Sequence, residues 1–440
     1  MDYEGSAELL DGAAKVLRNN DRQLWTVPAG DLYPHQWLWD SCFIAIGLRH
    51  LDVERAQTEL RSLLRGQWDN GMMPNMIFSH DSERRHIDLW RSWVNPYAPQ
   101  GVATSGITQP PMLAEAVLKI GEKLKMSERR SWFKEMLTPL IRYHEWLYAD
   151  RDPHNEGLII LLHPYESGMD SSPTWISELH KHSMPLWVSA IEKLHIDGVA
   201  NLFRRDTKYV SRSQRISNAE ALAEWSAVHR LRRKAYNSEA LISRSLFTVE
   251  DLAFNSILIR ANSRLLDIAK AAGRELPDNL KEGINRTEAA LEQLWDEESG
   301  LYFSRSFVSH KLIQETTISS LLPLYSGAIS KNRAHALVNM LKRRSMFSTS
   351  WPVPSVPQTS SYFDPYKYWQ GPSWVNTNWL IIEGLKNYGF LLEAKVLQDK
   401  TIKMVEKSGF YEYFNPLNGN PAGASNFSWT AALIIDLLKI

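Results

Sequence analysis

The sequence has a single cysteine, Cys42, among 440 residues, so no disulfide can form within the chain. Neither charge is in excess, because 50 lysine and arginine residues balance 50 aspartate and glutamate residues. This balance argues against a nucleic acid or an acidic membrane as the main partner. No apolar run approaches the roughly 20 residues of a membrane span, and Met1 to Glu4 lack the apolar core of a signal peptide. We expect a soluble cytoplasmic protein; whether it forms a homo-oligomer stays open.

Several motifs of familiar enzyme sites are also missing. The sequence has no glycine-rich phosphate loop ending in Lys-Ser or Lys-Thr, no His-Glu-x-x-His, no cysteine cluster for zinc and no Gly-x-Ser-x-Gly. His180 and His182 are two residues apart, and side chains at that spacing diverge on a helix. We therefore expect neither a metal nor a cofactor.

Aromatic residues, in contrast, are abundant, with 17 tryptophans and 16 tyrosines. Flat aromatic faces suit the C–H faces of sugar rings, and an indole N–H can bond a hydroxyl while its ring packs. Large helical proteins also use tryptophan for core packing, so the count alone leaves both interpretations open.

Apolar residues recur at helical spacing along most of the chain. Residues 79–107 form the main exception, a long irregular segment rich in charge, proline and tryptophan. There is no alternation of strands and helices and no low-complexity linker, which favours one all-α domain of helical hairpins over residues 1–440. The expected helices are 3–18, 43–48, 53–66, 110–125, 128–149, 176–195, 218–235, 249–272, 277–296, 314–322, 331–344, 374–387, 391–408 and 427–439.

The loops between these helices share one character: aromatic or polar side chains next to glycine or proline. Such a mixture suits a neutral polyol, and cleaving a glycosidic bond then requires two carboxyl groups, one protonated and one ionised. For any one acid, a helix cap or a solvated loop charge remains the structural alternative. The residues alone do not choose the pair from the eligible acids, which are Asp40, Glu166, Asp170, Asp364 and Glu412.

Five segments carry a family resemblance. They are Trp37 to Ser41, Gly71 to Pro74, Glu166 to Pro173, Tyr368 to Asn376 and Phe427 to Ala432. In this order along nearly the whole chain, they resemble glycoside hydrolase family 63, and within it the compact bacterial mannosylglycerate and glucosylglycerate hydrolases.

The resemblance implies an (α/α)6 barrel and hydrolysis with inversion at the anomeric carbon. It implies that Asp170 is the general acid and that Glu412 is the general base, which activates water. Arg215 matches an arginine that grips the glycerate carboxylate. The positions implied to bind substrate beside it are Tyr33, Trp37, Trp39, Asp40, Gln109, Tyr165, Trp369, Gln370, Gly371 and Trp374.

Two departures concern the leaving group. The glycerate-specific members have a tyrosine six residues after the arginine, where this chain has Ala221. Residues 79–95 are also longer and more basic here, with Arg84, Arg85 and Arg91. We expect a substrate resembling glucosylglycerate or mannosylglycerate, another small or charged aglycone, or a short α-glucoside.

Three other functions stay open. A trehalase-like α-glucosidase would share the Trp-Asp-Ser segment. A sugar epimerase or isomerase on the same barrel would use paired histidines, for which His35 and His163 stand in the aromatic loops. A non-catalytic sugar-binding protein would keep the tryptophans and tolerate the loss of the carboxylates.

Overall fold

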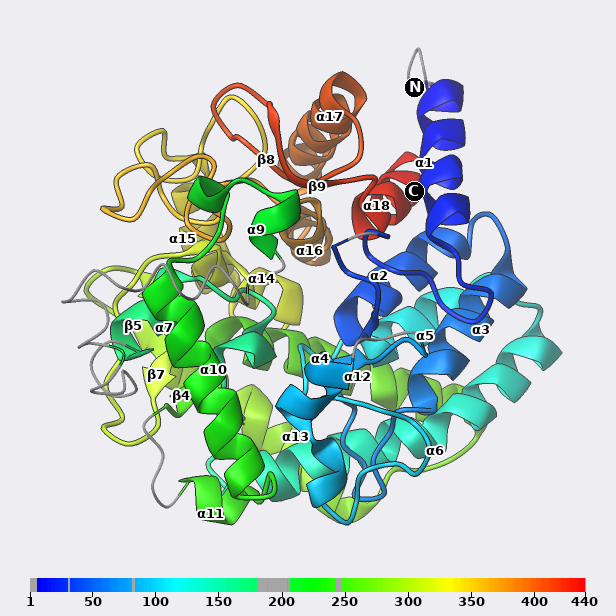
Figure 1. Ribbon diagram of the computed structural model, residues 1–440. Coiled ribbons are helices and arrows are strands. Elements are labelled where there is room, and N and C mark those ends of the chain that lie inside the picture. The colour runs from blue at the N-terminus through cyan, green and yellow to red at the C-terminus, as the bar shows by residue number, and fades with distance from the viewer. Residues whose placement is uncertain are drawn as a thin grey trace.

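The computed structural model describes residues 6–30, 32–80, 84–179, 188, 204, 206–242 and 247–439, and these are mostly helical (Figure 1). Within these ranges, no helix combines the length and apolar character that crossing a membrane requires.

Helices that contact one another in a closed ring form the centre of the described structure. Each contacts the next in chain order, and the last returns to the first. In α2 every residue is buried, and α16 is buried except near its end. A helix that is buried on all sides belongs to an interior. The ring consists of α2 (Leu38–Leu48), α5 (Leu113–Gly121), α12 (Leu252–Ala272), α14 (Pro323–Ser326), α16 (Val375–Asn387) and α18 (Ser428–Lys439).

A second set of helices packs against the outside of this ring. Their buried residues lie mainly on one face, as in α3, where Ala56, Glu59, Leu60 and Leu63 are buried. Such one-sided burial is typical of an amphipathic helix at a surface. The outer helices are α1 (Ser6–Asn20), α3 (Val53–Leu64), α6 (Met126–Arg151), α13 (Asp278–Ala290), α15 (Lys331–Lys342) and α17 (Leu391–Ser408).

The first and last inner helices pack especially closely. A Cβ atom placed on Gly47 of α2 would lie 2.3 Å from the carbonyl oxygen of Ala432 in α18. Only glycine permits this approach of backbone to backbone. The contact closes the ring between two segments that stand at opposite ends of the sequence.

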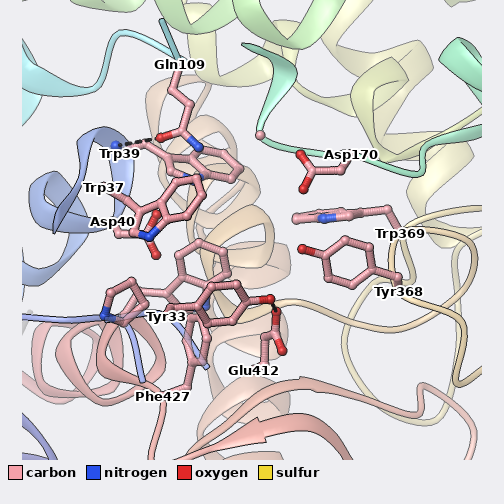
Figure 2. A pocket seen from close by; sticks show the side chains of 13 residues that line it. Tyr33, Trp37, Trp39, Asp40, Gln109, Asp170, Tyr368, Trp369, Glu412 and Phe427 are labelled. Carbon is pink, nitrogen blue, oxygen red and sulfur yellow. Dashed lines mark hydrogen bonds between the residues drawn. The ribbon is translucent and has the colours of Figure 1, made fainter. Parts of the chain in front are cut away.

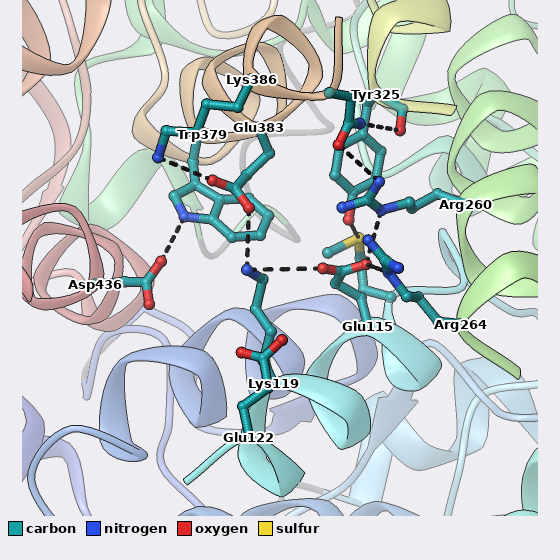
Figure 3. Close-up of polar contacts among 12 residues, drawn as sticks. Glu115, Lys119, Glu122, Arg260, Arg264, Tyr325, Trp379, Glu383, Lys386 and Asp436 are labelled. Atoms are coloured by element: carbon teal, nitrogen blue, oxygen red, sulfur yellow. Dashed lines mark hydrogen bonds and ion pairs between the residues drawn. The ribbon is translucent and has the colours of Figure 1, made fainter. Parts of the chain in front are cut away.

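Buried charges join α5, α12 and α16 (Figure 3). The carboxylate of Glu115 lies 3.0 Å from Arg260 Nε and 2.9 Å from Arg264 Nε. Lys119 Nζ lies 3.0 Å from Glu383 Oε2. Burial alone would raise the pKa of Glu115, but the three cations around it lower the pKa overall. These pairs keep the charged groups compensated inside the helical core.

Short antiparallel strands tie the loops together. β1 (Gln36–Trp37) pairs with β2 (Met76–Ile77), and β5 (Trp295–Asp296) pairs with β6 (Leu301–Tyr302). A three-stranded sheet has the order β3-β4-β7, formed by Ile160–Leu161, Val249–Glu250 and Arg305–Ser306. The longest pair is the hairpin of β8 (Tyr411–Phe414) and β9 (Pro421–Ser425).

The remaining elements lie in the connections between the ring helices, and α10 (Asn218–Arg233) is the longest of them. The other α-helices are α4 (Arg84–Trp90), α7 (Pro173–Glu178), α9 (Asp206–Tyr209) and α11 (Ser238–Ile242). The 3-10 helices are η1 (Ser92–Val94), η2 (Pro164–Ser167), η5 (Arg212–Gln214), η6 (Leu291–Leu294) and η7 (Ile318–Leu321).

The mostly helical character is confirmed, and the helix at 391–408 has the predicted bounds. Four predictions were wrong in part. The irregular segment 79–107 contains α4 and η1, and the predicted helix 314–322 is the 3-10 helix η7. The first residues of 249–272 form β4, and the last residues of 277–296 form η6 and β5. Most of the predicted helix 176–195 lies outside the described residues. Short apolar runs fit a strand, a 3-10 turn or a helix end equally well, so tertiary packing decides among them.

Candidate active site

A pocket lies where several inner helices begin (Figure 2). It is built from the first turns of α2 and α18, the segment before α5, the loop before α16 and the hairpin strand β8. Its volume is about 50 Å³. This inner pocket is lined by Pro28, Tyr33, Trp37, Trp39, Asp40, Gln109, Gly168, Asp170, Tyr368, Trp369, Glu412, Phe427 and Trp429.

A wider outer pocket of about 260 Å³ adjoins the inner one. Tyr33, Trp37, Asp170 and Tyr368 line both pockets, so these four side chains mark the junction. Glu412 lines only the inner pocket. The outer pocket's other lining residues are Asn75, Met76, Leu89, Trp90, Tyr165, Asp206, Arg215, Ile216 and Trp225.

Asp170 stands at this junction in an environment that favours its protonated form. Burial raises the pKa of its carboxyl group to about 7, with a further contribution from the negative charge of Glu412. The positive charge of Arg215 and a hydrogen bond from Tyr368 act in the opposite direction without cancelling the rise. A carboxyl group with such a pKa can donate a proton near neutral pH.

Hydrogen bonds from the loop before α16 fix the backbone around Asp170. Gln370 Nε2 donates to the carbonyl oxygen of Ser171 at 2.9 Å, and the Trp369 N–H donates to Ser171 Oγ at 3.2 Å. The indole of Trp175 donates to the Met169 carbonyl oxygen at 2.7 Å. The residues on both sides of Asp170 are therefore held, which restricts the position of its carboxyl group.

Glu412 lies on β8 with 1% of its surface exposed. Its Oε1 accepts from the Tyr33 hydroxyl at 2.8 Å, and its Oε2 accepts from the Ala424 N–H at 3.0 Å. Arg215 Nη2 donates to Oε2 at 2.7 Å, and Arg215 Nη1 donates to Oε1 at 3.4 Å. Four donors thus surround this buried carboxyl group, and two of them belong to one guanidinium.

Asp40 adds a third carboxyl group in the first turn of α2, and it is 5% exposed. Burial raises its pKa well above the ordinary value, and the charges of Glu412 and Asp170 add to the rise. Three carboxyl groups around one small pocket thus differ in environment, the arrangement by which one fold separates acids from bases.

Aromatic rings form most of the inner wall. The ring of Trp39 packs edge-on against Trp429, with centroids 5.6 Å apart, and also contacts Trp369. The indole Nε1 atoms of Trp37 and Trp429 are buried without a hydrogen-bond partner. A buried donor without a partner is costly, so these two groups are suited to bonding the hydroxyls of a bound ligand.

Three of the predicted substrate-binding residues lie behind this wall. Trp374 stacks on Trp369 with centroids 3.8 Å apart, and it does not line either pocket. Gln370 holds Ser171 as described above. A Cβ atom on Gly371, which has φ 159°, would lie 2.1 Å from the Asp364 carbonyl oxygen, so the close turn requires glycine. In this structure these residues support the pocket from behind.

The two other eligible acids, Glu166 and Asp364, make contacts that stabilise the fold. Glu166 is buried and paired with Arg151 at 2.8 Å, and it accepts the Leu162 N–H at 2.6 Å. Asp364 is exposed and accepts the Tyr366 N–H at 2.9 Å, a turn contact. Neither lines the inner or outer pocket.

His35 and His163, the two histidines that an epimerase could use, line neither the inner nor the outer pocket. Burial lowers the pKa of His163 to about 4. Its Nδ1 accepts the Tyr165 N–H at 3.1 Å, and its Nε2 lies 3.1 Å from the Glu224 carbonyl oxygen. Both ring nitrogens are therefore engaged with the backbone. In the part of the chain that the structure describes, no three His, Cys, Asp or Glu side chains are grouped as a metal site would require.

Comparison with known proteins identifies the family. The model of the mannosylglycerate hydrolase MGH1-like glycoside hydrolase domain matches residues 33–430. The chain belongs to this family. It is 39% identical to a mannosylglycerate hydrolase from Thermus thermophilus over 96% of this chain and 99% of that one. It is 32% identical to a glucosylglycerate hydrolase from Mycolicibacterium hassiacum over 98% of each.

A solved structure gives the same result. The crystal structure of a family 63 mannosylglycerate hydrolase from Thermus thermophilus, in complex with Tris and D-glycerate, matches with a TM-score of 0.87 and 38% identity. The match covers 97% of this chain and 99% of that one. The resemblance to glycoside hydrolase family 63 is thereby confirmed, and the protein is a glycosidase.

The two departures noted in the sequence of this glycosidase lie around the outer pocket. Ala221 is buried in α10, with 3% of its surface exposed. Of residues 79–95, Leu89 and Trp90 at the end of α4 line the outer pocket, and α4 packs on α10. Arg91 is exposed, and the side chains of Arg84 and Arg85 lie outside the described residues.

Sequence reasoning missed several residues of the site. Tyr368, Phe427 and Trp429 line the inner pocket and stand inside the quoted family segments, so their motifs marked the region without giving them roles. Glu224 is 2% exposed, and its Oε2 has no hydrogen-bond partner. Burial raises the pKa of Glu224 well above its ordinary value, and Asp170 adds to the rise. It lies within the helical pattern of α10, and nothing in that pattern distinguishes it from a surface glutamate.

Proposed function

We propose that this family 63 glycosidase hydrolyses an α-linked glucoside or mannoside of glycerate, or of a similar small anionic alcohol, with inversion of configuration. One observation carries the proposal. Asp170 lines both pockets, whereas Glu412 lines only the inner one. An acid at the junction suits the oxygen that joins the sugar to its leaving group, and a carboxylate confined to the inner pocket suits a water beside the sugar.

The roles follow from this placement. The sugar ring occupies the inner pocket between the tryptophans, and Asp40 accepts hydrogen bonds from its hydroxyls. Asp170 gives its proton to the glycosidic oxygen as the bond to the anomeric carbon breaks. Glu412 takes a proton from a water whose oxygen bonds to that carbon from the opposite face. The products are the sugar with inverted anomeric configuration and the free alcohol.

The outer pocket supports an anionic leaving group. Arg215 is the guanidinium that lines it, and its Nε has no acceptor. A guanidinium matches a carboxylate in geometry and charge. Relatives named mannosylglycerate hydrolase and glucosylglycerate hydrolase cover nearly the whole chain, which favours glycerate as the alcohol.

We also propose that residues 1–440 form one (α/α)6 barrel with the site at its mouth. The closed ring of inner helices supports this architecture, as do the outer helices packed against it. The lining residues come from segments at the starts of α2, α5, α16 and α18, as expected for the mouth of such a barrel.

The test is release of free hexose from glucosylglycerate, mannosylglycerate, glucosylglycerol and trehalose. We expect the two glycerates to be the best substrates. Asp170→Asn and Glu412→Gln should each lower the rate about 10²- to 10⁴-fold, because acid and base catalysis contribute this much. Proton NMR should show the β-anomer forming first from an α-substrate. Wild-type rates in either variant, or an α-anomer as first product, would contradict the assigned roles.

A further inference from the structure

The carboxylate of Glu412 has no free position at which to take a proton. A carboxylate offers about four lone-pair sites, two on each oxygen. Oε1 accepts from the Tyr33 hydroxyl at 2.8 Å and from Arg215 Nη1 at 3.4 Å, and the same Nη1 also donates to the Tyr33 hydroxyl at 2.8 Å. Oε2 accepts from Arg215 Nη2 and the Ala424 N–H. A general base must accept a hydrogen bond from the water that it activates. One of these four donors must therefore withdraw before Glu412 can act.

Arg215 is the donor best placed to withdraw. The Ala424 N–H belongs to β9, whose pairing with β8 fixes it. The Arg215 guanidinium instead lies over the face of Tyr368, 4.6 Å from the ring centroid, and lines the outer pocket. Its backbone neighbour Gln214 is tied to the hairpin, because the Gln214 carbonyl oxygen accepts from the Tyr413 hydroxyl at 2.9 Å. The side chain can thus change its partner while the segment that carries it stays in place.

We propose that Arg215 holds Glu412 inactive in the empty site, and that an anionic leaving group in the outer pocket releases it by drawing the guanidinium to its own carboxylate. This inference rests on the proposed function and adds to it a way to select anionic over neutral leaving groups. A neutral leaving group of the same size would bind in the outer pocket and leave the base engaged. The enzyme would then select leaving groups with a carboxylate mainly through kcat. The interaction between Arg215 and that carboxylate forms as Glu412 is released, so it acts on the chemical step more than on binding.

A glycosyl fluoride separates this step from the rest of the reaction. Fluoride leaves without a proton, so the reaction does not need Asp170, and the small leaving group does not fill the outer pocket. In the reaction, a water oxygen bonds to the anomeric carbon, the C–F bond breaks to release fluoride, and Glu412 takes the proton from the water. The substrates are α-D-glucosyl fluoride and α-D-mannosyl fluoride, and the one that is turned over faster is used throughout.

The experiment measures fluoride release with added D-glycerate and, as the matched neutral control, glycerol. We expect D-glycerate to raise kcat saturably by about 10-fold or more, part of the contribution of base catalysis, and glycerol to have no effect. Arg215→Gln should lose the activation, and its kcat without glycerate should exceed that of the wild type.

The outcomes separate the two proposals. If Glu412→Gln hydrolyses the fluoride at the wild-type rate, Glu412 is not the base and the proposed function fails. If Glu412→Gln is inactive but D-glycerate inhibits the wild type, has no effect at saturation, or acts no better than glycerol, the function stands and the release of Glu412 is refuted. Activation that persists in Arg215→Gln also refutes it. If Arg215 had a purely structural role, Arg215→Gln would be slower than the wild type, and D-glycerate would not activate the wild type.

Discussion

Replacing Asp170 by asparagine should stabilise the protein at alkaline pH. The folded pKa of this carboxyl is about 7, against an ordinary value of 3.8. Below the lower value both folded and unfolded chains carry the proton, so the charge makes no difference to stability. Between the two values the unfolded chain is ionised while the folded chain retains its proton, so stability falls as pH rises. The full difference is about 4 kcal/mol at 1.36 kcal/mol per pKa unit, an upper limit reached above pH 7.

The measurement is the free energy of unfolding of the wild type and Asp170→Asn by urea titration between pH 5 and 8. The advantage of Asp170→Asn should grow by about 1–3 kcal/mol across this range and become constant above about pH 7. An advantage that does not change with pH, or that shrinks as pH rises, would refute the argument that burial holds this carboxyl protonated.

Asp436→Asn is the matched control, because Asp436 is a buried aspartate with a pKa shift of the opposite direction. Burial acts to raise its pKa, but a hydrogen bond from His50 and the charge of Arg49 outweigh it and lower the pKa. Arg49 Nη2 lies 2.7 Å from Asp436 Oδ1. Asp436→Asn should therefore destabilise the protein at pH 8 by about 3–5 kcal/mol, because the buried Arg49 then keeps only the more distant carboxylate of Glu122, 3.7 Å away.

Three further predictions concern the site and its support. First, kcat for a glycoside should fall as pH rises through about 7, because Asp170 is deprotonated above that pH and has no proton for the leaving group; a kcat that stays constant from pH 6 to 9 would contradict its role. Second, Glu166→Gln should lower the free energy of unfolding by about 3 kcal/mol, measured by urea titration, because Arg151 loses a buried partner; an unchanged value would show that the pair contributes nothing. Third, Asp40→Asn should lower kcat/KM about 10- to 100-fold without lowering the melting temperature, because a carboxyl oxygen that accepts hydroxyl bonds is lost; unchanged kinetics would remove Asp40 from the substrate contacts.

The sequence was sufficient for the type of fold. Inner helices such as Leu38–Leu48 are nearly all apolar, and outer ones such as Val53–Leu64 show an apolar stripe, since burial on all sides and on one side require different patterns. Helix starts were also readable, since the helix expected from residue 53 begins at Val53, and the side chain of Asp52 before it accepts the Arg55 N–H at 2.9 Å. The family resemblance further brought Asp170 and Glu412 forward from several eligible acids.

The sequence alone could not separate residues that line the pocket from residues that support it. Trp369 and Trp374 belong to one short motif, yet only Trp369 lines the inner pocket, and Trp374 stacks behind it. Glu166 and Asp170 are four residues apart, yet one is paired with Arg151 and the other lies at the junction of the pockets. Which side of a wall a residue occupies depends on neighbours that come from distant parts of the chain.

The tertiary structure also decided the electrostatics. Asp170, Arg215 and Glu412 are far apart in sequence, and only the closing of the helical ring brings the last two to 2.7 Å. The raised pKa of Asp170 and the full set of donors around Glu412 arise from burial and from charges on other elements. A sequence determines which side chains a chain carries and which of its faces are apolar. The pKa of a carboxyl group and the availability of a base depend on distances across the fold, because charge interactions and desolvation act through space rather than along the chain.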